Sequence, residues 1–364
     1  MADIPTIGVE EEFLLVDPES GAPLPRNRDV ADHAAQLGLD LQLELTSCQI
    51  ETATDVAHTA DELHTSLVRL RRTAADAADQ AGARLLAAGL PPTLPHDFPI
   101  TDTPRYRDIG DRFGMIAHEQ GICGCHVHVA VPDRDAAVAV SNRLRPWLPA
   151  LLALTANSAI YRNADTGHSS WRSVLWARWP SAGPPPHFDS AAEYDAAVQM
   201  LVQSEVIRDD GMVYWDVRPS ADFPTVEIRV ADVPATVGET VLLAALARAA
   251  VMTALAEEDR GDPQPTVDAW TLKAAYWKAA RDGLDGHGVD LRSNTAAPVQ
   301  TLLQNLVDWV RPALEVAGDE DLVHRSLTAV VEHGNGAMRQ RRAWRRRHDM
   351  RDVLAVVADA TLEF

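Results

Sequence analysis

The sequence predicts an α+β fold in which helices cover one face of a sheet and leave the other face open. Two observations support this prediction. Short segments place polar residues on one face, as half-buried strands do, and longer segments carry one apolar stripe at helical spacing. These two patterns alternate along much of the chain, so helices should pack against the apolar face of the sheet. We therefore expect ligands on its polar face.

Strand patterns occur at residues 6–16, 39–45, 84–88, 121–131, 214–218 and 225–230. In LDLQLEL, at 39–45, every second residue is leucine and the residues between are polar. Pro132 closes the pattern at 121–131, and residues 219–224 connect the last two segments, which we expect to pair. A proline-rich loop is predicted at 90–99.

Helical periodicity begins at residues 55–82, where apolar residues from Val56 to Ala81 recur at spacings of three and four. The same periodicity predicts helices at 135–161, 190–206, 236–259, 268–280, 298–316, 320–332 and 339–359. The C-terminal third should therefore be almost entirely helical.

Composition narrows the class of protein. The chain has 364 residues without a linker or repeat, which predicts a single domain over residues 1–364. Its 33 Lys and Arg against 53 Asp and Glu give a net charge of −20, which disfavours nucleic acid and anionic membranes as partners and favours small molecules.

The location of the protein is predicted from three further features. Residues 1–5 lack a basic and apolar leader, and the most apolar long segment, 240–256, contains Arg248. The 3 cysteines cannot form a disulfide framework. We therefore expect a cytoplasmic protein.

The stretch GVEEEF, at 8–13, places three carboxylates inside a strand pattern. Because side chains two apart share a face, Glu10 and Glu12 lie together, opposite Val9 and Phe13. Glu11 then falls on the apolar side, where it needs a bulge, a strand end or a positive partner. Carboxylates in such a place indicate a bound metal, nearby arginines or an edge open to solvent.

Three other segments present polar groups in the same way. Parity places His126 and His128 on the polar face of their strand, and Glu227 with Arg229 on that of theirs. Glu44 lies on the polar face of 39–45, and Glu51 follows a predicted break at 46–48. The glutamates outnumber the imidazoles, and hard oxygen ligands suit Mg²⁺ or Mn²⁺ bound together with a nucleotide.

Arg229 beside Glu227 could stabilise a phosphoryl group in transfer. A zinc site built from Cys123, Cys125 and the two histidines is disfavoured, because parity sends thiols and imidazoles to opposite faces. His128 contacts either a phosphate or metal, or a backbone carbonyl.

The motifs occur together in one order over nearly the whole chain. They are GVEEEF, Glu44 and Glu51, CGCHVHVAVPD at 123–133, DTGHSSWRSVLWARWPSAGPP at 165–185 and TVEIRVADVPATV at 225–237. In this combination the sequence resembles the carboxylate-amine ligase family, also called type 2 glutamate-cysteine ligases. The resemblance implies the glutamine-synthetase-like catalytic fold, a curved antiparallel sheet whose concave face holds ATP and magnesium ions, and it is compatible with a homodimer.

The resemblance also implies residue roles. Metal ligands would be Glu10, Glu12, Glu44, Glu51, His126 and Glu227, and Arg229 would bind the γ-phosphate. The Arg-Gln-Arg of the family matches Arg339 and Arg341, which would reach nucleotide phosphates; the alternative for this basic run is a solvated helix face or nucleic-acid binding. Arg172 and Arg218 are candidates for the substrate carboxylate, and Trp215 for a wall of the substrate pocket.

The implied reaction is amide formation from an amino acid or other carboxylate and an amine, through an acyl phosphate. In the best-known case glutamate and cysteine are joined. Two alternatives from other classes remain: a phosphotransferase related to guanidino kinases, and a metal-dependent hydrolase that needs no nucleotide. The pair of substrates is left open by the sequence.

Overall fold

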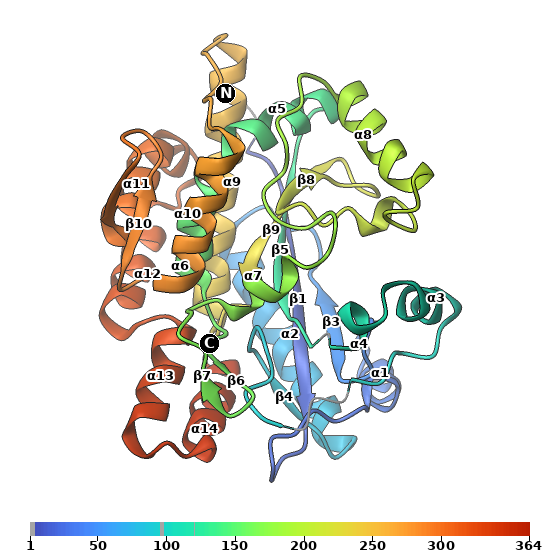
Figure 1. The fold of residues 1–364 in the computed structure, drawn as a ribbon. Helices are drawn as coiled ribbons and strands as arrows, with labels where there is room; N and C mark the ends of the chain where they lie inside the picture. Colours follow the sequence, from blue (N-terminus) through green and yellow to red (C-terminus); the bar gives the residue numbers. More distant parts are fainter. Residues whose placement is uncertain (1–3, 95–97, 120) are drawn as a thin grey trace.

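The computed structural model describes residues 4–94, 98–119 and 121–364. Its centre is a seven-stranded antiparallel sheet with strand order β2-β3-β1-β5-β9-β8, in which β4 pairs with the end of β1 (Figure 1). The strands are β1 (Ile7–Val16), β2 (Gln42–Leu43), β3 (Gln49–Ala53), β4 (Arg84–Leu86), β5 (Gly124–Ala130), β8 (Val217–Pro219) and β9 (Thr225–Asp232). The predicted α+β class is confirmed.

Helices surround this sheet along most of the chain. They are α1 (Asn27–Gln36), α2 (Ala60–Gln80), α3 (Pro104–Phe113), α4 (Met115–His118), α5 (Arg134–Leu144), α6 (Leu148–Thr155), α7 (Trp171–Trp176), α8 (Ala191–Gln203), α9 (Val237–Asp259), α10 (Ala269–Asp282), α11 (Val299–Ala317), α12 (Glu320–His333), α13 (Gly336–Arg347) and α14 (Met350–Thr361). Two small hairpins, β6 (Ile160–Tyr161) with β7 (Ala164–Asp165) and β10 (His287–Asp290) with β11 (Thr295–Pro298), stand apart from the main sheet.

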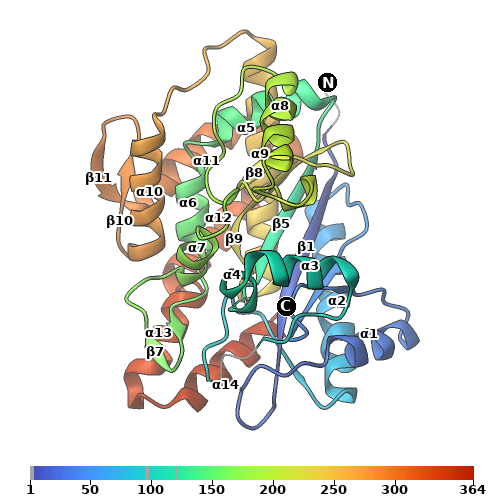
Figure 2. The same ribbon diagram turned by 45° about the vertical axis from the view of Figure 1, so that its right-hand side comes forward.

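The apolar face of the sheet packs against α2, α5, α6 and α9, and α10, α11 and α12 pack outside these helices. In Figure 2 the C-terminal helices form a layer on one side of the sheet, and α3 and α4 lie on the other side. The main core joins Val127, Val129, Ile228 and Val230 of the strands to the apolar residues of α9. Strand parity therefore leaves the remaining face for polar groups.

Helix α9 runs through the middle of this core. Within the described part of the chain it is the one helix long and apolar enough to span a membrane, and 72% of its apolar stretch is buried inside the protein. A helix that is apolar on all sides is typical of a core position. Its buried Arg248 forms an ion pair with Asp319 at 2.6 Å.

Some predicted boundaries are wrong. The alternating pattern at 39–45 forms a strand only at Gln42–Leu43, because only these residues pair with β3 at the sheet edge. The helix predicted at 55–82 begins at Ala60, where the Thr59 hydroxyl accepts a hydrogen bond from Glu62 N at 3.1 Å. Residues 95–97 of the predicted loop lie outside the described residues.

Two predicted helices are each divided in two. The helix predicted at 135–161 becomes α5 and α6, and Pro146 lies between them, where a proline disfavours continuation of α5. The helix predicted at 339–359 breaks at His348, whose φ of 55° is left-handed, and Asp349 caps the helix that follows. The sequence patterns did not predict β3, α1, α3, α4, α7 or either hairpin.

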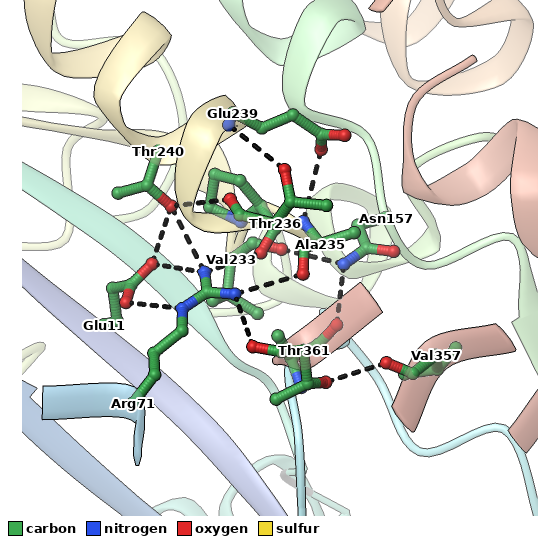
Figure 3. A network of polar contacts seen from close by, with 12 residues as sticks. Glu11, Arg71, Asn157, Val233, Ala235, Thr236, Glu239, Thr240, Val357 and Thr361 are labelled. Atoms are coloured by element: carbon green, nitrogen blue, oxygen red, sulfur yellow. Dashed lines mark hydrogen bonds and ion pairs between the residues drawn. The ribbon is translucent and has the colours of Figure 1, made fainter. Parts of the chain in front are cut away.

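The positive partner that Glu11 requires is Arg71 of α2. Both side chains are fully buried, and Arg71 donates to Glu11 through Nη2 at 2.6 Å and Nε at 3.0 Å. Figure 3 shows the same guanidinium reaching the carbonyl oxygens of Ala235 and Thr361, while Thr240 also donates to Glu11. This network ties the back of β1 to three distant parts of the chain.

Candidate active site

The predicted polar residues of β1, β3, β5 and β9 meet on one face of the sheet. The strand register places Glu12 opposite Glu51, Glu10 opposite His126, and His128 opposite Glu227. Residues directly opposite each other in an antiparallel pair project from the same face. Segments more than two hundred residues apart in the chain thus share one surface, as parity predicted.

Three overlapping groups of side chains on this surface have the geometry of cation sites. They are Glu10 with Glu51 and His126, Glu10 with His128 and Glu227, and Glu12 with Glu44 and Glu51, and in each group the ligand atoms lie within 4.8 Å of one another. His126 Nδ1 is 3.1 Å from Glu10 Oε2, and His128 Nε2 is 3.5 Å from Glu10 Oε1. No group among the described residues includes a cysteine: Cys123 and Cys125 are buried on the packing side.

The carboxylates of this surface have strongly shifted pKa values. Burial, together with the charge of Glu12, raises the pKa of Glu44 to about 8. Burial and the neighbouring Glu44 raise the pKa of Glu51 well above its usual range. Crowded carboxylates ionise readily only beside a cation. The donor set, with carboxylate oxygens in the majority, therefore fits divalent cations.

Glu10 and Glu227 behave in the opposite way. Burial would raise the pKa of Glu10, but hydrogen bonds and charge from His126 and His128 outweigh it and lower the pKa. Burial would likewise raise the pKa of Glu227, but Arg229 and Arg218 hold it well below its usual range. Both carboxylates are thus ionised and available as ligands.

Two arginines hold Glu227. Arg218 Nε donates to its Oε2 at 2.8 Å, and Arg229 Nη1 donates to Oε1. Arg229 Nη1 also lies 3.4 Å from His126 Nδ1, so its charge stands at the centre of the carboxylate and imidazole rows. Arg218 is further occupied by the carbonyl oxygen of Val213, to which its Nη1 donates at 2.5 Å.

A cavity opens above this surface. It is lined by Glu10, Glu12, Glu44, Leu45, Gln49, Glu51, Arg105, Tyr106, Ile109, Ile122, His126, Arg172, Trp176, Trp179, Gly211, Tyr214, Arg218 and Arg229. The carboxylates form one wall, and aromatic and arginine side chains form the others. An anionic substrate could thus lie between a metal-binding wall and a cationic one.

Arg172, at the second position of α7, reaches this cavity because Gly124 has no side chain. A Cβ at Gly124 would lie 2.3 Å from Arg172 Nη2 and 3.3 Å from His126 Nε2. Arg172 is 2% exposed, its Nε has no hydrogen-bond partner among the described residues, and its guanidinium lies 5.8 Å from the Trp176 ring centre. Its nearest carboxylate is Asp232, at 3.8 Å.

Other predicted residues lie outside the cavity. Trp215 packs in an aromatic cluster with Phe188 and Tyr194 and does not line this cavity. Its contact with a substrate stays a prediction. Tyr214, which precedes β8, lines the pocket.

Arg339 and Arg341 lie on α13 and do not line the cavity. Arg339 pairs with Glu239, and Arg341 Nε donates to Asp165 at 3.1 Å. Both guanidinium groups are thus occupied by carboxylates of the chain itself. A contact of either residue with nucleotide phosphates stays a prediction.

Part of the cavity is formed by residues that the sequence patterns did not predict. Arg105 and Tyr106 come from α3, which had no recognised pattern, although Thr103 before Pro104 is a typical helix start. Gln49 comes from β3, where its Nε2 donates to the carbonyl of Ile122 at 2.7 Å. Trp176 and Trp179 also line the pocket.

The chain is similar to known proteins over nearly its full length. The model of glutamate-cysteine ligase family 2 (GCS2) matches residues 6–358. Two bacterial relatives are named "Putative glutamate--cysteine ligase 2-2", in Mycolicibacterium vanbaalenii, and "2-1", in Nocardia farcinica. The first is 73% identical over 363 residues and 100% of both chains, and the second is 59% identical over 361 residues, 99% of this chain and 94% of its own.

Solved structures show the same fold. The glutamate-cysteine ligase of Francisella tularensis, in complex with AMP, superposes with a TM-score of 0.71 at 14% identity, over 98% of this chain and 88% of its own. A bifunctional glutathione synthetase from Pasteurella multocida gives 0.66 at 16% identity, over 98% and 52%. The predicted glutamine-synthetase-like fold is therefore confirmed. By its sequence over nearly its full length, the chain belongs to the glutamate-cysteine ligase family 2.

Proposed function

We propose that this protein is an ATP-dependent ligase that joins a carboxylate to an amine through an acyl phosphate. The observation that carries the proposal is the meeting of Glu10, Glu12, Glu51, His126 and Glu227 on one sheet face around Arg229. Family membership supports the ligase class, and the AMP bound to the Francisella enzyme supports a nucleotide substrate. Glutamate and cysteine are the substrates that the names of the relatives favour.

The carboxylate wall is the proposed site of Mg²⁺ or Mn²⁺. Glu12, Glu44 and Glu51 supply only oxygen ligands, while His126 and His128 each join Glu10 in a mixed set. Bound there, the ions would neutralise the phosphates of ATP and leave them open to attack. The raised pKa values of Glu44 and Glu51 support this assignment. Burial and neighbouring carboxylates disfavour their ionised forms, and a bound cation would compensate these negative charges.

Arg229 and Arg172 would each bind a different anionic group of the substrates. Arg229 stands beside Glu227 and His126 and would bind the transferring phosphoryl group. Arg172 would bind the substrate carboxylate, because its guanidinium makes no hydrogen bond to any described residue, whereas Arg218 is held by Glu227. Arg218 then serves to fix Glu227.

The reaction follows in two steps. A carboxylate oxygen of the first substrate bonds to the γ-phosphorus of ATP, the bond from that phosphorus to the bridging oxygen breaks, and ADP leaves. The amine nitrogen then bonds to the carbonyl carbon of the acyl phosphate, the carbon to oxygen bond breaks, and phosphate leaves with a proton released from the amine. The chain itself contributes Arg229 and Arg172, which would position the reacting groups and stabilise their negative charge.

One assay tests this proposal against its alternatives. The protein receives Mg-ATP, a panel of amino acids that includes L-glutamate, and hydroxylamine as the amine. A ligase releases phosphate and forms a hydroxamate, a phosphotransferase forms a stable phosphorylated product, and a hydrolase leaves ATP intact. Absence of ATP cleavage with every amino acid would refute the proposal.

A further inference from the structure

Asp232 is a buried carboxylate next to the candidate active site that the reaction above does not use. It is the last residue of β9, its exposed fraction is 0%, and it pairs with Gly124 across the sheet. It reaches this position through a bulge: Cys125 and Val127 of β5 face Ala231 and Ile228, so β9 carries an extra residue there. The bulge places Asp232 on the side of the sheet that bears Arg172.

Both carboxylate oxygens of Asp232 have partners. Oδ2 accepts hydrogen bonds from Asn157 N at 2.8 Å and from Ser158 Oγ at 2.7 Å. Oδ1 accepts one from Ser170 Oγ at 2.8 Å and lies 3.8 Å from Arg172 Nη1. Asp232 is thus a counter-ion of Arg172 without a hydrogen bond to it, and no other described residue accepts a hydrogen bond from the guanidinium.

These partners all lie in one segment, residues 157–172, which ends in α7. The backbones of Ser158 and Ser170 pair in an isolated parallel β-bridge, and Ser158 Oγ accepts a hydrogen bond from Arg172 N at 3.0 Å. One buried carboxylate therefore fixes both ends of the loop that presents Arg172. The loop cannot shift at either end without breaking a hydrogen bond to Asp232.

Helix α13 holds the same loop from its other side. Gln340 Nε2 donates to Asn157 Oδ1 at 2.9 Å, and Gln340 Oε1 accepts from Ala159 N at 3.0 Å. Arg341 Nη1 donates to Ser169 Oγ at 3.0 Å. The Arg-Gln-Arg motif thus contacts the loop of Arg172 and supports the position that Asp232 sets.

We infer that Asp232 is a positioning residue that holds the Arg172 guanidinium toward the substrate carboxylate while leaving its N–H donors unused. This inference rests on the proposed function. The contrast with Arg218 supports this inference. Arg218 donates a hydrogen bond to Glu227 at 2.8 Å, whereas Arg172 lies 3.8 Å from Asp232, which compensates its charge without accepting a hydrogen bond from it. An arginine kept in this way is ready to form a bidentate pair with a carboxylate.

The test is the substitution Asp232→Asn, which keeps the shape of the side chain and removes its charge. With L-glutamate, hydroxylamine and Mg-ATP, we expect the KM for glutamate to rise by about tenfold or more, while kcat and the KM for Mg-ATP stay within about twofold. If Asp232 had only a structural role, the substitution would lower the melting temperature and the fraction of active protein, and therefore the apparent kcat. It would not raise the KM for glutamate relative to the KM for Mg-ATP.

Asp319→Asn is the matched control, because Asp319 is also a buried aspartate paired with an arginine, Arg248, but it lies at the start of α12 and neither residue lines the cavity. It should lower the melting temperature and leave both KM values unchanged. An Asp232→Asn variant that folds and keeps the wild-type KM for glutamate would overturn the inference, as would equal changes in both KM values.

Two further measurements cover the remaining outcomes. If Asp232→Asn does not fold, Ser170→Ala removes one hydrogen bond from Oδ1 and should raise the KM for glutamate selectively by a smaller factor; no rise overturns the inference. If the wild-type protein cleaves ATP with no amino acid, the proposed function fails. In that case the crystal structure of the Asp232→Asn variant tests the positioning role separately. If the Arg172 guanidinium keeps its wild-type position next to Gly124 in this variant, Asp232 does not position it.

Discussion

Glu11 and Arg71 form a fully buried, two-point ion pair directly behind the strand that carries Glu10 and Glu12. The three glutamates of GVEEEF therefore have different tasks. Glu10 and Glu12 face the cavity, while Glu11 binds Arg71 of α2, which in turn donates to the carbonyl oxygens of Ala235 and Thr361 (Figure 3).

Arg71→Met should destabilise the protein strongly. The substitution leaves Glu11 charged, buried and without its cation, which costs about 3–5 kcal/mol in comparable pairs. Urea unfolding measures the change in the free energy of unfolding. The double substitution Glu11→Leu with Arg71→Met should recover much of the loss, because no uncompensated charge remains.

The control for this pair is Arg26→Ala. Arg26 and Asp29 form an ion pair whose side chains are 52% and 51% exposed, so its removal should change the free energy of unfolding by less than about 1 kcal/mol. A loss from Arg71→Met as small as that of the control would show that the buried pair does not hold β1.

Glu227→Gln should reduce turnover by about a hundredfold or more, because it removes one carboxylate from the metal-binding face and the charge that holds Arg229 and Arg218. The fold should persist, since the amide has the same shape. ATP-dependent hydroxamate formation and circular dichroism measure the two effects. Glu320→Gln, at an exposed helix start, is the control; a fully active Glu227→Gln protein would remove Glu227 from the site.

Magnesium should stabilise the protein in the absence of substrate. A ligand that binds only the folded state raises stability by about 2.7 kcal/mol at a hundred times its dissociation constant. The melting temperature should therefore rise with MgCl₂ and not with NaCl of equal ionic strength. Glu51→Gln should weaken this response, since Glu51 belongs to two of the ligand groups; an undiminished response would place the ion elsewhere.

Gly124→Ala should raise the KM for the carboxylate substrate, by about tenfold or more, because its Cβ would lie 2.3 Å from Arg172 Nη2. Gly8→Ala is the matched control on the neighbouring strand, where a new Cβ would meet nothing nearer than 4.0 Å. Steady-state kinetics with L-glutamate compare the two variants. Equal KM values in both would show that the close approach of Arg172 to Gly124 does not matter for binding.

Asp216 should make stability depend on pH. Burial raises its pKa to about 6 in the folded protein, so the folded state binds more protons than the unfolded state between its usual value of 3.8 and this value. The contribution of Asp216 to the free energy of unfolding is fully present at pH values below 3.8 and is lost as the pH rises through about 6. The loss amounts to up to about 3 kcal/mol.

Asp216→Asn isolates this contribution. The melting temperature of the variant minus that of the wild type should be more positive at pH 7 than at pH 4, because the variant has no carboxylate to ionise. Thermal unfolding across this range measures the difference. A constant difference would show that Asp216 does not titrate between these two pH values.

Much of the metal-binding face followed from parity alone. Side chains two apart on a strand share a face, and this local rule placed Glu10 with Glu12, His126 with His128, and Glu227 with Arg229 before any pairing was known. It also placed Glu11 on the apolar side, where a bulge, a strand end or a positive partner was expected. The same rule gave a wrong length for the strand at 39–45, because strand formation depends on a neighbour that pairs along its whole length.

Other parts of the site depend on contacts between distant segments. Sequence analysis named Arg172 and Arg218 as equal candidates for the substrate carboxylate, and only the structure shows that Glu227 occupies Arg218 while Arg172 has Asp232 at a distance. Trp215 was predicted at a wall of the substrate pocket, and the structure places its neighbour Tyr214 in the lining of the cavity.

The sequence by itself therefore determined the fold class, the family and the faces of the strands, since these depend on local backbone geometry and on the order of motifs. Tertiary structure decided which cation pairs with which carboxylate. Such pairing depends on burial and on distances of a few ångströms between segments far apart in the chain, and no local pattern contains that information.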